Sequence, residues 1–259
     1  MKVFIFTGPT LRPDEARATL DAIYLPPVQQ GDVYRAAREG PVAIGIIDGF
    51  FEHVPAVWHK EILWALSEGI HVFGASSMGA LRAAELSAFG MEGVGEIFAA
   101  FHRGELEDDD DVAVAHGASE DGWRPLSEAM VNISATLSAA WLGQVVREET
   151  RNTLERVAKS LFYMERAWPV VLARGAREGV PASELEALKA WLPTGRVDQK
   201  KADALALLRT MRERLDAGLS PKKVAFPFQH TDAWEEARRR AGRLPLVRDG
   251  QPLEGVAPE

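Results

Sequence analysis

A short apolar run followed at once by small residues constrains the fold of this chain more than any other stretch. Residues 70–73 (Ile-His-Val-Phe) have the length and apolar character of a buried strand. Residues 78–86 are rich in alanine, leucine, arginine and glutamate, which favour a helix. Only small residues, Gly-Ala-Ser-Ser at 74–77, lie between the two. The stretch therefore predicts a strand that turns sharply into a helix, with a serine at the bend.

Ser77 at this bend has two interpretations. The pattern Ala75-x-Ser77-x-Gly79 is one glycine short of the G-x-S-x-G nucleophile elbow, in which the N–H after the serine helps to bind an oxyanion. The other interpretation is a helix N-cap, because a serine before a helix satisfies an unpaired N–H group. Spacing alone favours the cap, so the catalytic interpretation needs a second residue.

Other apolar runs predict the rest of an α/β fold. Residues 3–6 and 42–47 are apolar on both faces, as expected for strands of a parallel sheet covered by helices on both sides. Helices are expected at 13–22, 31–39 and 55–66, and a last strand at 112–116. We expect an N-terminal parallel sheet flanked by helices over residues 1–124. A mainly helical region with a loose C-terminal tail is expected over residues 125–259.

Candidate ligand-binding residues follow two of the expected strands. The Gly8 loop after the first strand could receive an anion or a substrate backbone. Asp48 and Gly49 follow the strand at 42–47, at the edge where open α/β sheets bind ligands. A turn aspartate that bonds its own backbone is an equally good explanation of Asp48.

Lys60 is the candidate for the second residue. It lies in the expected helix at 55–66, between apolar residues one turn before and one turn after it. A lysine in such a stripe either extends its ammonium to solvent or is desolvated, which lowers its pKa and makes it a usable general base. The helix begins at the edge of the sheet where Ser77 is expected, so the two side chains can plausibly meet.

Composition excludes several classes of function. The chain has no cysteine, which excludes disulfides, thiolate metal sites and a cysteine nucleophile, and fits a cytoplasmic protein. A net charge of −8 argues against nucleic acid as a partner, and no apolar run is long enough to span a membrane. Residues 105–111 hold six acids in seven positions, typical of a solvated turn, with a loose cation site or a docking patch as the alternatives.

Six blocks of the sequence together resemble the TfuA-like family, in order over roughly residues 1–150. They are Phe6-Thr-Gly-Pro9, Leu25-Pro-Pro-Val-Gln-Gln-Gly-Asp-Val33, Ile44-Gly-Ile-Ile-Asp-Gly-Phe50, Pro55-Ala-Val-Trp-His-Lys-Glu-Ile62, Gly74-Ala-Ser-Ser-Met-Gly-Ala-Leu-Arg-Ala-Ala-Glu-Leu86 and Pro125-Leu-Ser-Glu-Ala-Met-Val-Asn132.

The resemblance implies a role in peptide backbone thioamidation beside a YcaO enzyme. TfuA-like proteins are held to release sulfide from a thiocarboxylated ThiS-like carrier protein with a Ser–Lys pair, and to help YcaO engage its peptide substrate. The pair falls on Ser77 and Lys60, although Ser76 stands where a smaller residue such as alanine is more usual. Neither a metal nor a cofactor is implied. The remaining site residues are assigned to oxyanion or substrate binding: Met78, Gly79, Gly8, Asp48, Gly49 and His59.

Two alternatives to the hydrolase remain. One is a non-catalytic adaptor that allosterically helps YcaO bind its peptide, with Ser77 a cap and Lys60 a packing residue. The other is a small-molecule esterase, weakened because the chain lacks the serine, acid and histidine order of that class.

Overall fold

The computed structural model describes residues 1–51, 54–248 and 251–252, which form two compact units. The first unit combines residues 1–107 with the chain from residue 201 onward, and the second comprises residues 108–200. This division differs from the boundary expected at residue 124. The C-terminal part of the chain returns to the N-terminal unit instead of extending a separate helical region.

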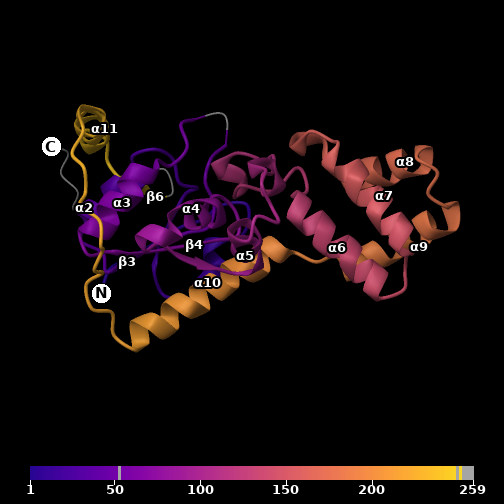
Figure 1. The fold of residues 1–259 in the computed structure, drawn as a ribbon, viewed down its shortest axis with the longest axis horizontal. Coiled ribbons are helices and arrows are strands. Elements are labelled where there is room, and N and C mark those ends of the chain that lie inside the picture. Colours follow the sequence, from indigo (N-terminus) through magenta and orange to yellow (C-terminus); the bar gives the residue numbers. More distant parts are fainter. Residues whose placement is uncertain (52–53, 249–250, 253–259) are drawn as a thin grey trace. The chain divides into compact units, whose positions relative to one another are not determined.

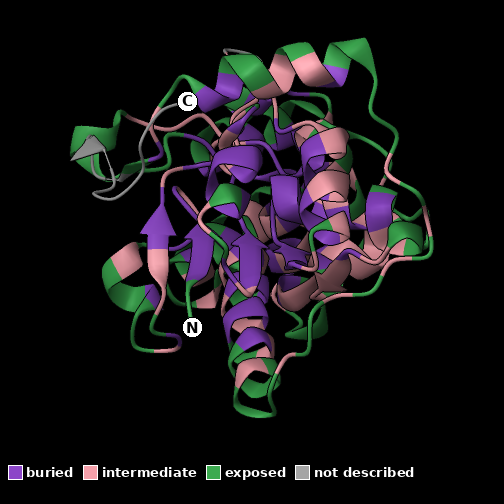
Figure 2. Cartoon of the chain, turned by 90° about the vertical axis from the view of Figure 1, so that its left-hand side faces the viewer, coloured by how far each residue is buried: buried purple, intermediate pink, exposed green. Residues whose placement is uncertain are grey.

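The first unit is built on a parallel five-stranded sheet in the order β2-β1-β3-β4-β5, which confirms the expected α/β class (Figure 1). The strands are β1 (Val3–Phe6), β2 (Ile23–Leu25), β3 (Ala43–Ile46), β4 (His71–Ala75) and β5 (Glu92–Val94). β1 pairs with β3 so that Phe6 lies opposite Ile46, and β3 pairs with β4 so that Ile46 lies opposite Gly74. These central strands are buried along their whole length, as Figure 2 shows in purple.

Helices from both ends of the chain cover the two faces of this sheet. On one face, apolar residues of α2 (Asp32–Arg38), α3 (His59–Ser67) and α4 (Met78–Leu86) share a core with the strands. On the other face lie α1 (Pro13–Ala16) and α10 (Gln199–Asp216), whose Leu207, Leu208 and Met211 are fully buried. The second face of an N-terminal sheet is therefore completed by a C-terminal helix.

The tail expected to be loose contains an ordered helix that packs on α2. In α11 (Asp232–Gly242), Thr231 caps the first turn by accepting a hydrogen bond from the Trp234 N–H. Trp234 is only 1% exposed and contacts Tyr34 and Trp64 edge-on or tilted. The remaining elements of the first unit are α5 (Glu96–His102), η1 (Ser87–Phe89) and the antiparallel pair β6 (Val247–Arg248) and β7 (Gln251–Pro252).

The second unit is helical, with its own apolar core. Its elements are η2 (Asp109–Asp111), η3 (Ser119–Asp121), α6 (Met130–Leu142), α7 (Glu148–Lys159), η4 (Tyr163–Glu165), α8 (Trp168–Arg177) and α9 (Ala182–Gly195). No helix in the described ranges is long and apolar enough to cross a membrane.

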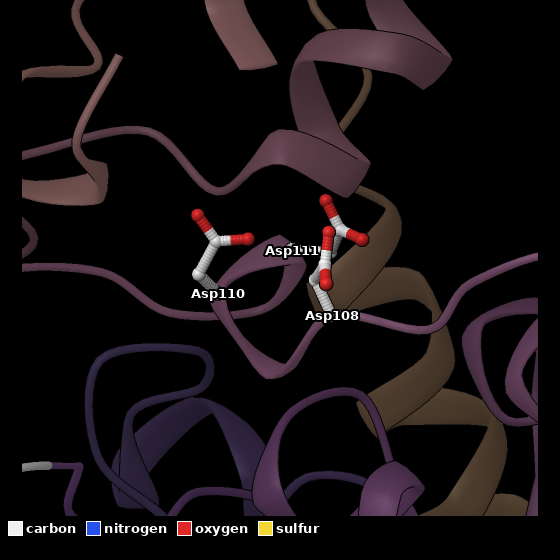
Figure 3. A group of neighbouring side chains, drawn as sticks. All are labelled: Asp108, Asp110 and Asp111. Carbon is white, nitrogen blue, oxygen red and sulfur yellow. The ribbon is translucent and has the colours of Figure 1, made fainter. Parts of the chain in front are cut away.

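The acidic run of the second unit is held by cations of its own chain. Figure 3 shows Asp108, Asp110 and Asp111, whose carboxylates bring oxygens within 4.8 Å of one another. Lys159 Nζ lies 2.9 Å from Asp108 and Asp110 and 2.5 Å from Asp111, and the fully buried Arg166 binds Asp110. Burial alone would lower the pKa of Lys159, but the hydrogen bonds to these carboxylates outweigh it and raise that pKa. An ammonium group thus satisfies the cluster, which was expected to be a solvated turn.

Several expected elements differ in extent or position. The helix expected at 55–66 begins only at His59, and the one expected at 13–22 ends at Ala16. The predicted last strand at 112–116 is wrong, because these residues are irregular apart from one bridge between His116 and Pro125. The fifth strand is β5, which was not among the expected strands because it is short and only half-buried.

Candidate functional site

The loops that follow β1, β3 and β4 meet at the carboxyl edge of the sheet. The strand order reverses between β1 and β3, and such a switch point is where open α/β sheets bind ligands. Gly8 follows β1, Asp48 and Gly49 follow β3, and Ser77 follows β4. Three of the expected site segments thus share one edge, as the parallel topology requires.

Asp48 lies buried at the switch point. Its side chain is 1% exposed and accepts hydrogen bonds from the Gly8 N–H (2.8 Å), the Thr10 N–H (3.0 Å) and the Thr10 hydroxyl (2.6 Å). The loop after β2 closes over the same place, since the Val28 N–H bonds the Asp48 carbonyl and Pro27 lies against Gly8. The Gly8 N–H expected to receive an anion therefore already holds the carboxylate of Asp48.

We expect Asp48→Ala to lower the free energy of unfolding by about 2–4 kcal/mol, because it leaves the buried Gly8 N–H and two donors of the half-buried Thr10 without their acceptor. Urea denaturation followed by circular dichroism measures this. The exposed Asp14, whose ion pair is with Arg12, provides a matched control, and its alanine variant should change stability by less than about 0.5 kcal/mol. Equal effects of the two substitutions would show that the Asp48 carboxylate does not stabilise the contact between the loops after β1 and β3.

Two glycines allow α4 to press against the sheet directly after β4. A Cβ atom on Gly79 would lie 1.8 Å from the Ile46 carbonyl oxygen, and one on Gly74 would lie 2.1 Å from the Gly79 carbonyl oxygen. A Cβ on Gly49 would lie within 2.8 Å of the Met78 side chain, so the β3 loop also touches the start of α4. Because α4 packs so closely on the sheet, the chain has to turn sharply at residues 76 and 77.

Ser76 and Ser77 occupy the turn in different ways. Ser76 has the left-handed φ of +68°, unusual for a residue with a side chain, and its buried hydroxyl has no hydrogen-bond partner in the described part of the chain. Ser77 is the N-cap residue of α4 and is 3% exposed, but its side chain makes no capping hydrogen bond. The N-cap that spacing favoured is therefore present in position but not in its usual interaction.

Backbone N–H groups at the start of α4 differ in their availability. The Ser77 N–H donates to the Ala75 carbonyl at 2.8 Å, and the Gly79 N–H donates to the Ile47 carbonyl at 3.3 Å. The Met78 N–H has no acceptor among the residues that the structure describes. Of the two expected oxyanion donors, Met78 is thus the one whose hydrogen is not already engaged.

Lys60 is held by the C-terminal segment. It is the second residue of α3 and is half-buried, and its Nζ donates to the Thr231 hydroxyl at 3.1 Å. The same ammonium lies 5.5 Å from the centroid of the Phe228 ring. The predicted contact with Ser77 is therefore not the one that this conformation of Lys60 makes, and the Ser–Lys pair stays a prediction.

The start of α3 is nevertheless tied to α4, the helix that follows Ser77. His59 Nε2 lies 2.7 Å from Glu85 Oε2, and Arg82 bonds both Glu85 and the Val57 carbonyl. These contacts place the segment that carries Lys60 beside the helix that directly follows the two serines. The ring of His59, expected among the substrate-binding residues, is partly exposed and contacts the Glu85 carboxylate in this structure.

Glu61, which no sequence pattern singled out, is a second almost fully buried carboxyl group of the first unit. Its oxygens accept hydrogen bonds from the N–H groups of Gly31, Val33, Tyr34 and Trp58 at 2.8–3.2 Å, so it joins the starts of α2 and α3. An acid at the third position of a helix is the sequence signal for the bond to Trp58, but not for the others. Burial raises the pKa of Glu61 from 4.5 to about 7, against the effect of these hydrogen bonds.

A raised pKa makes the folded protein bind a proton that the unfolded chain releases. We therefore expect the contribution of Glu61 to stability to fall as the pH rises from about 4.5 to about 7, by on the order of 3 kcal/mol. Urea unfolding of wild type and Glu61→Gln at several pH values isolates this contribution as a difference. A difference between the two proteins that stays constant over this range would contradict the assignment.

A match to a known protein family covers most of this site. Residues 48–167 match the family model of TfuA-like proteins. This segment is TfuA-like. The TfuA-like segment contains Asp48, Lys60 and the whole β4–α4 turn, whereas Gly8 precedes it. No individual curated protein matches the chain. At the level of the family, the similarity carries an association with YcaO-dependent peptide thioamidation.

Proposed function

We propose that this chain works beside a YcaO enzyme and releases sulfide from a thiocarboxylated ThiS-like carrier protein, with Ser77 as nucleophile. The observation that carries the proposal is the β4–α4 turn. A buried serine that does not cap its helix lies there directly before the unengaged N–H of Met78. A serine beside a free helix N-terminal N–H is the arrangement that acyl transfer requires.

The proposed reaction passes through an acyl-serine ester. Lys60 first loses a proton to solvent as the bound carrier desolvates it, and its neutral Nζ then takes the Ser77 hydroxyl proton while Ser77 Oγ attacks the carbonyl carbon of the carrier's C-terminal thiocarboxylate. The Met78 N–H stabilises the oxyanion, the Lys60 ammonium returns the proton to the leaving sulfur, the C–S bond breaks and sulfide leaves as HS⁻. Water then hydrolyses the ester and restores Ser77 together with a carrier that ends in a carboxylate. Sulfide is a good leaving group, so a lysine base without histidine suffices.

Lys60 has to leave Thr231 before it can act as the base. That step gives up one hydrogen bond to a hydroxyl at the surface and one contact with Phe228. Together they cost about 1–2 kcal/mol, which an ordinary binding event supplies. The ties between the start of α3 and α4 support this movement, because they keep the backbone of Lys60 beside the helix that Ser77 begins.

The engagement of Lys60 also favours the second candidate function, the non-catalytic adaptor. A lysine fixed on Thr231 and Phe228 packs the C-terminal segment against α3 and needs no chemical role. In that case the chain would assist YcaO through binding alone.

Mass spectrometry of a thiocarboxylated ThiS-like carrier separates the two candidates. The carrier is incubated with wild type, Ser77→Ala, Lys60→Ala or no protein, and the conversion of thiocarboxylate to carboxylate is followed. Conversion by wild type and failure of both folded variants would support the hydrolase. Equal conversion in all samples, or none in any, would overturn it and leave the adaptor.

A further inference from the structure

A strap of irregular chain, residues 221–231, connects α10 with α11 across the first unit (Figure 1). Its side chains alternate between half-buried and exposed from residue 222 to residue 229, as expected for an extended segment that lies on a surface. The half-buried Val224 and Phe226 pack against the core that α2, α3 and α4 share with the sheet. Phe228 packs against the aromatic cluster to which α11 contributes. The strap is therefore attached to the unit through alternate side chains.

Backbone hydrogen bonds contribute little to this attachment. The Lys222 N–H donates to the Gly69 carbonyl at 2.8 Å, near the α10 end of the strap. From residue 223 to residue 230, no backbone group bonds to the backbone of another segment that the structure describes. Segments with few backbone hydrogen bonds and many exposed residues open at a lower free energy than the core does. The strap can therefore lift while the sheet stays folded.

The α11 end of the strap holds Lys60. The Lys60 Nζ donates to the Thr231 hydroxyl at 3.1 Å and lies 5.5 Å from the centroid of the Phe228 ring, so two strap residues contact one ammonium group. The same hydroxyl accepts a hydrogen bond from the Trp234 N–H at 3.3 Å. Trp234 is only 1% exposed, so a buried anchor sets the position of the hydroxyl that binds Lys60. The hold on Lys60 is thus coupled to the packing of α11.

We propose that the strap is an autoinhibitory contact. It keeps Lys60 engaged, and so unable to serve as the base for Ser77, until the strap lifts from the start of α3. The inference rests on the proposed function, because Lys60 is the proposed base of that reaction. The chain alone would then release sulfide slowly, and a partner that displaces the strap would accelerate the release.

Acetylation of Lys60 measures this hold without any reaction at Ser77. Brief treatment with N-acetoxysuccinimide, followed by peptide mass spectrometry, gives the rate at Lys60 relative to the exposed Lys189 of α9. We expect Phe228→Leu and Thr231→Val each to raise this relative rate at least about 3-fold, because each removes one contact of the ammonium group. Thr231→Ser keeps the hydroxyl and should stay within about 2-fold of wild type. Unchanged acetylation in both Phe228→Leu and Thr231→Val would overturn the proposal.

Sulfide release at a carrier concentration well below saturation tests the regulatory role. Phe228→Leu and Thr231→Val should release sulfide at least about 3-fold faster than wild type, and Thr231→Ser should not. Adding Lys60→Ala to each variant should abolish the gain, and thermal denaturation shows that the variants are folded.

The two possible failures give different results. Release by wild type that neither folded strap variant accelerates would overturn the inference and leave the proposed function standing. A gain that persists with Lys60→Ala would also overturn the inference, because the strap would then act on another group. No release from any sample would overturn the proposed function and the inference together.

Discussion

Replacing Ser77 with alanine is expected to lower the rate of sulfide release from the thiocarboxylated carrier by at least about 10³-fold. The reaction then lacks the oxygen that forms the ester, while the Met78 N–H remains. The fold should persist, because the substitution removes one hydroxyl that does not cap α4. Quenched samples analysed by mass spectrometry give the rate, and circular dichroism confirms the fold.

Ser76→Ala is the matched control for Ser77→Ala, because it removes the neighbouring serine hydroxyl of the same turn. The Ser76 hydroxyl has no partner in the described structure, so its removal costs little, and we expect a rate within about 3-fold of wild type. The left-handed backbone of Ser76 is nevertheless the geometry that nucleophile elbows use. A large loss in Ser76→Ala with an active Ser77→Ala would show that Ser76 is the nucleophile and that the assignment to Ser77 is wrong.

Gly79→Ala is expected to destabilise the protein by more than about 3 kcal/mol. The added methyl group would lie 1.8 Å from the Ile46 carbonyl oxygen, which belongs to the backbone of the central strand β3. Neither partner is a flexible side chain, so α4 has to move away from the sheet and disturb the serine turn. Urea denaturation of the purified variant measures the loss.

Gly117→Ala is the matched control for this substitution. Its added methyl group meets its nearest neighbours at 3.5 Å or more, an ordinary contact distance. We expect a change in stability of less than about 1 kcal/mol. If Gly79→Ala were as stable as Gly117→Ala, the helix would not need its close approach to β3.

Local sequence patterns predicted the centre of the fold well. The apolar runs that form β1, β3 and β4 are buried on both faces, and this pattern identifies a parallel sheet without knowledge of its partners. The positions of Asp48 and Ser77 followed from the same pattern, since parallel strands end at one edge. Glu92–Val94 was missed because three half-buried residues with a glycine carry no periodic signal.

Local sequence patterns could not predict contacts between segments that are far apart in the chain. Lys60 was expected to face Ser77, yet its hydroxyl partner is Thr231, 171 residues further along the chain. The apolar positions around Lys60 in the sequence are equally compatible with a side chain beside Ser77 and with one beside Thr231. The carboxylate of Glu61 likewise accepts hydrogen bonds from the start of α2, 27–30 residues earlier in the chain. The helix α11 forms in a stretch whose composition suggested a loose tail.

The C-terminal origin of α10 determines when this protein can complete its fold during synthesis. When the ribosome has made residues 1–107, the face of the sheet with Ile5, Ile47 and Phe73 still lacks the helix that buries it. About 100 more residues must be made before Met211 exists, which takes about 5–20 s at ordinary rates of translation. For that time the nascent chain exposes apolar side chains on one face of its sheet, a surface that a ribosome-associated chaperone would bind.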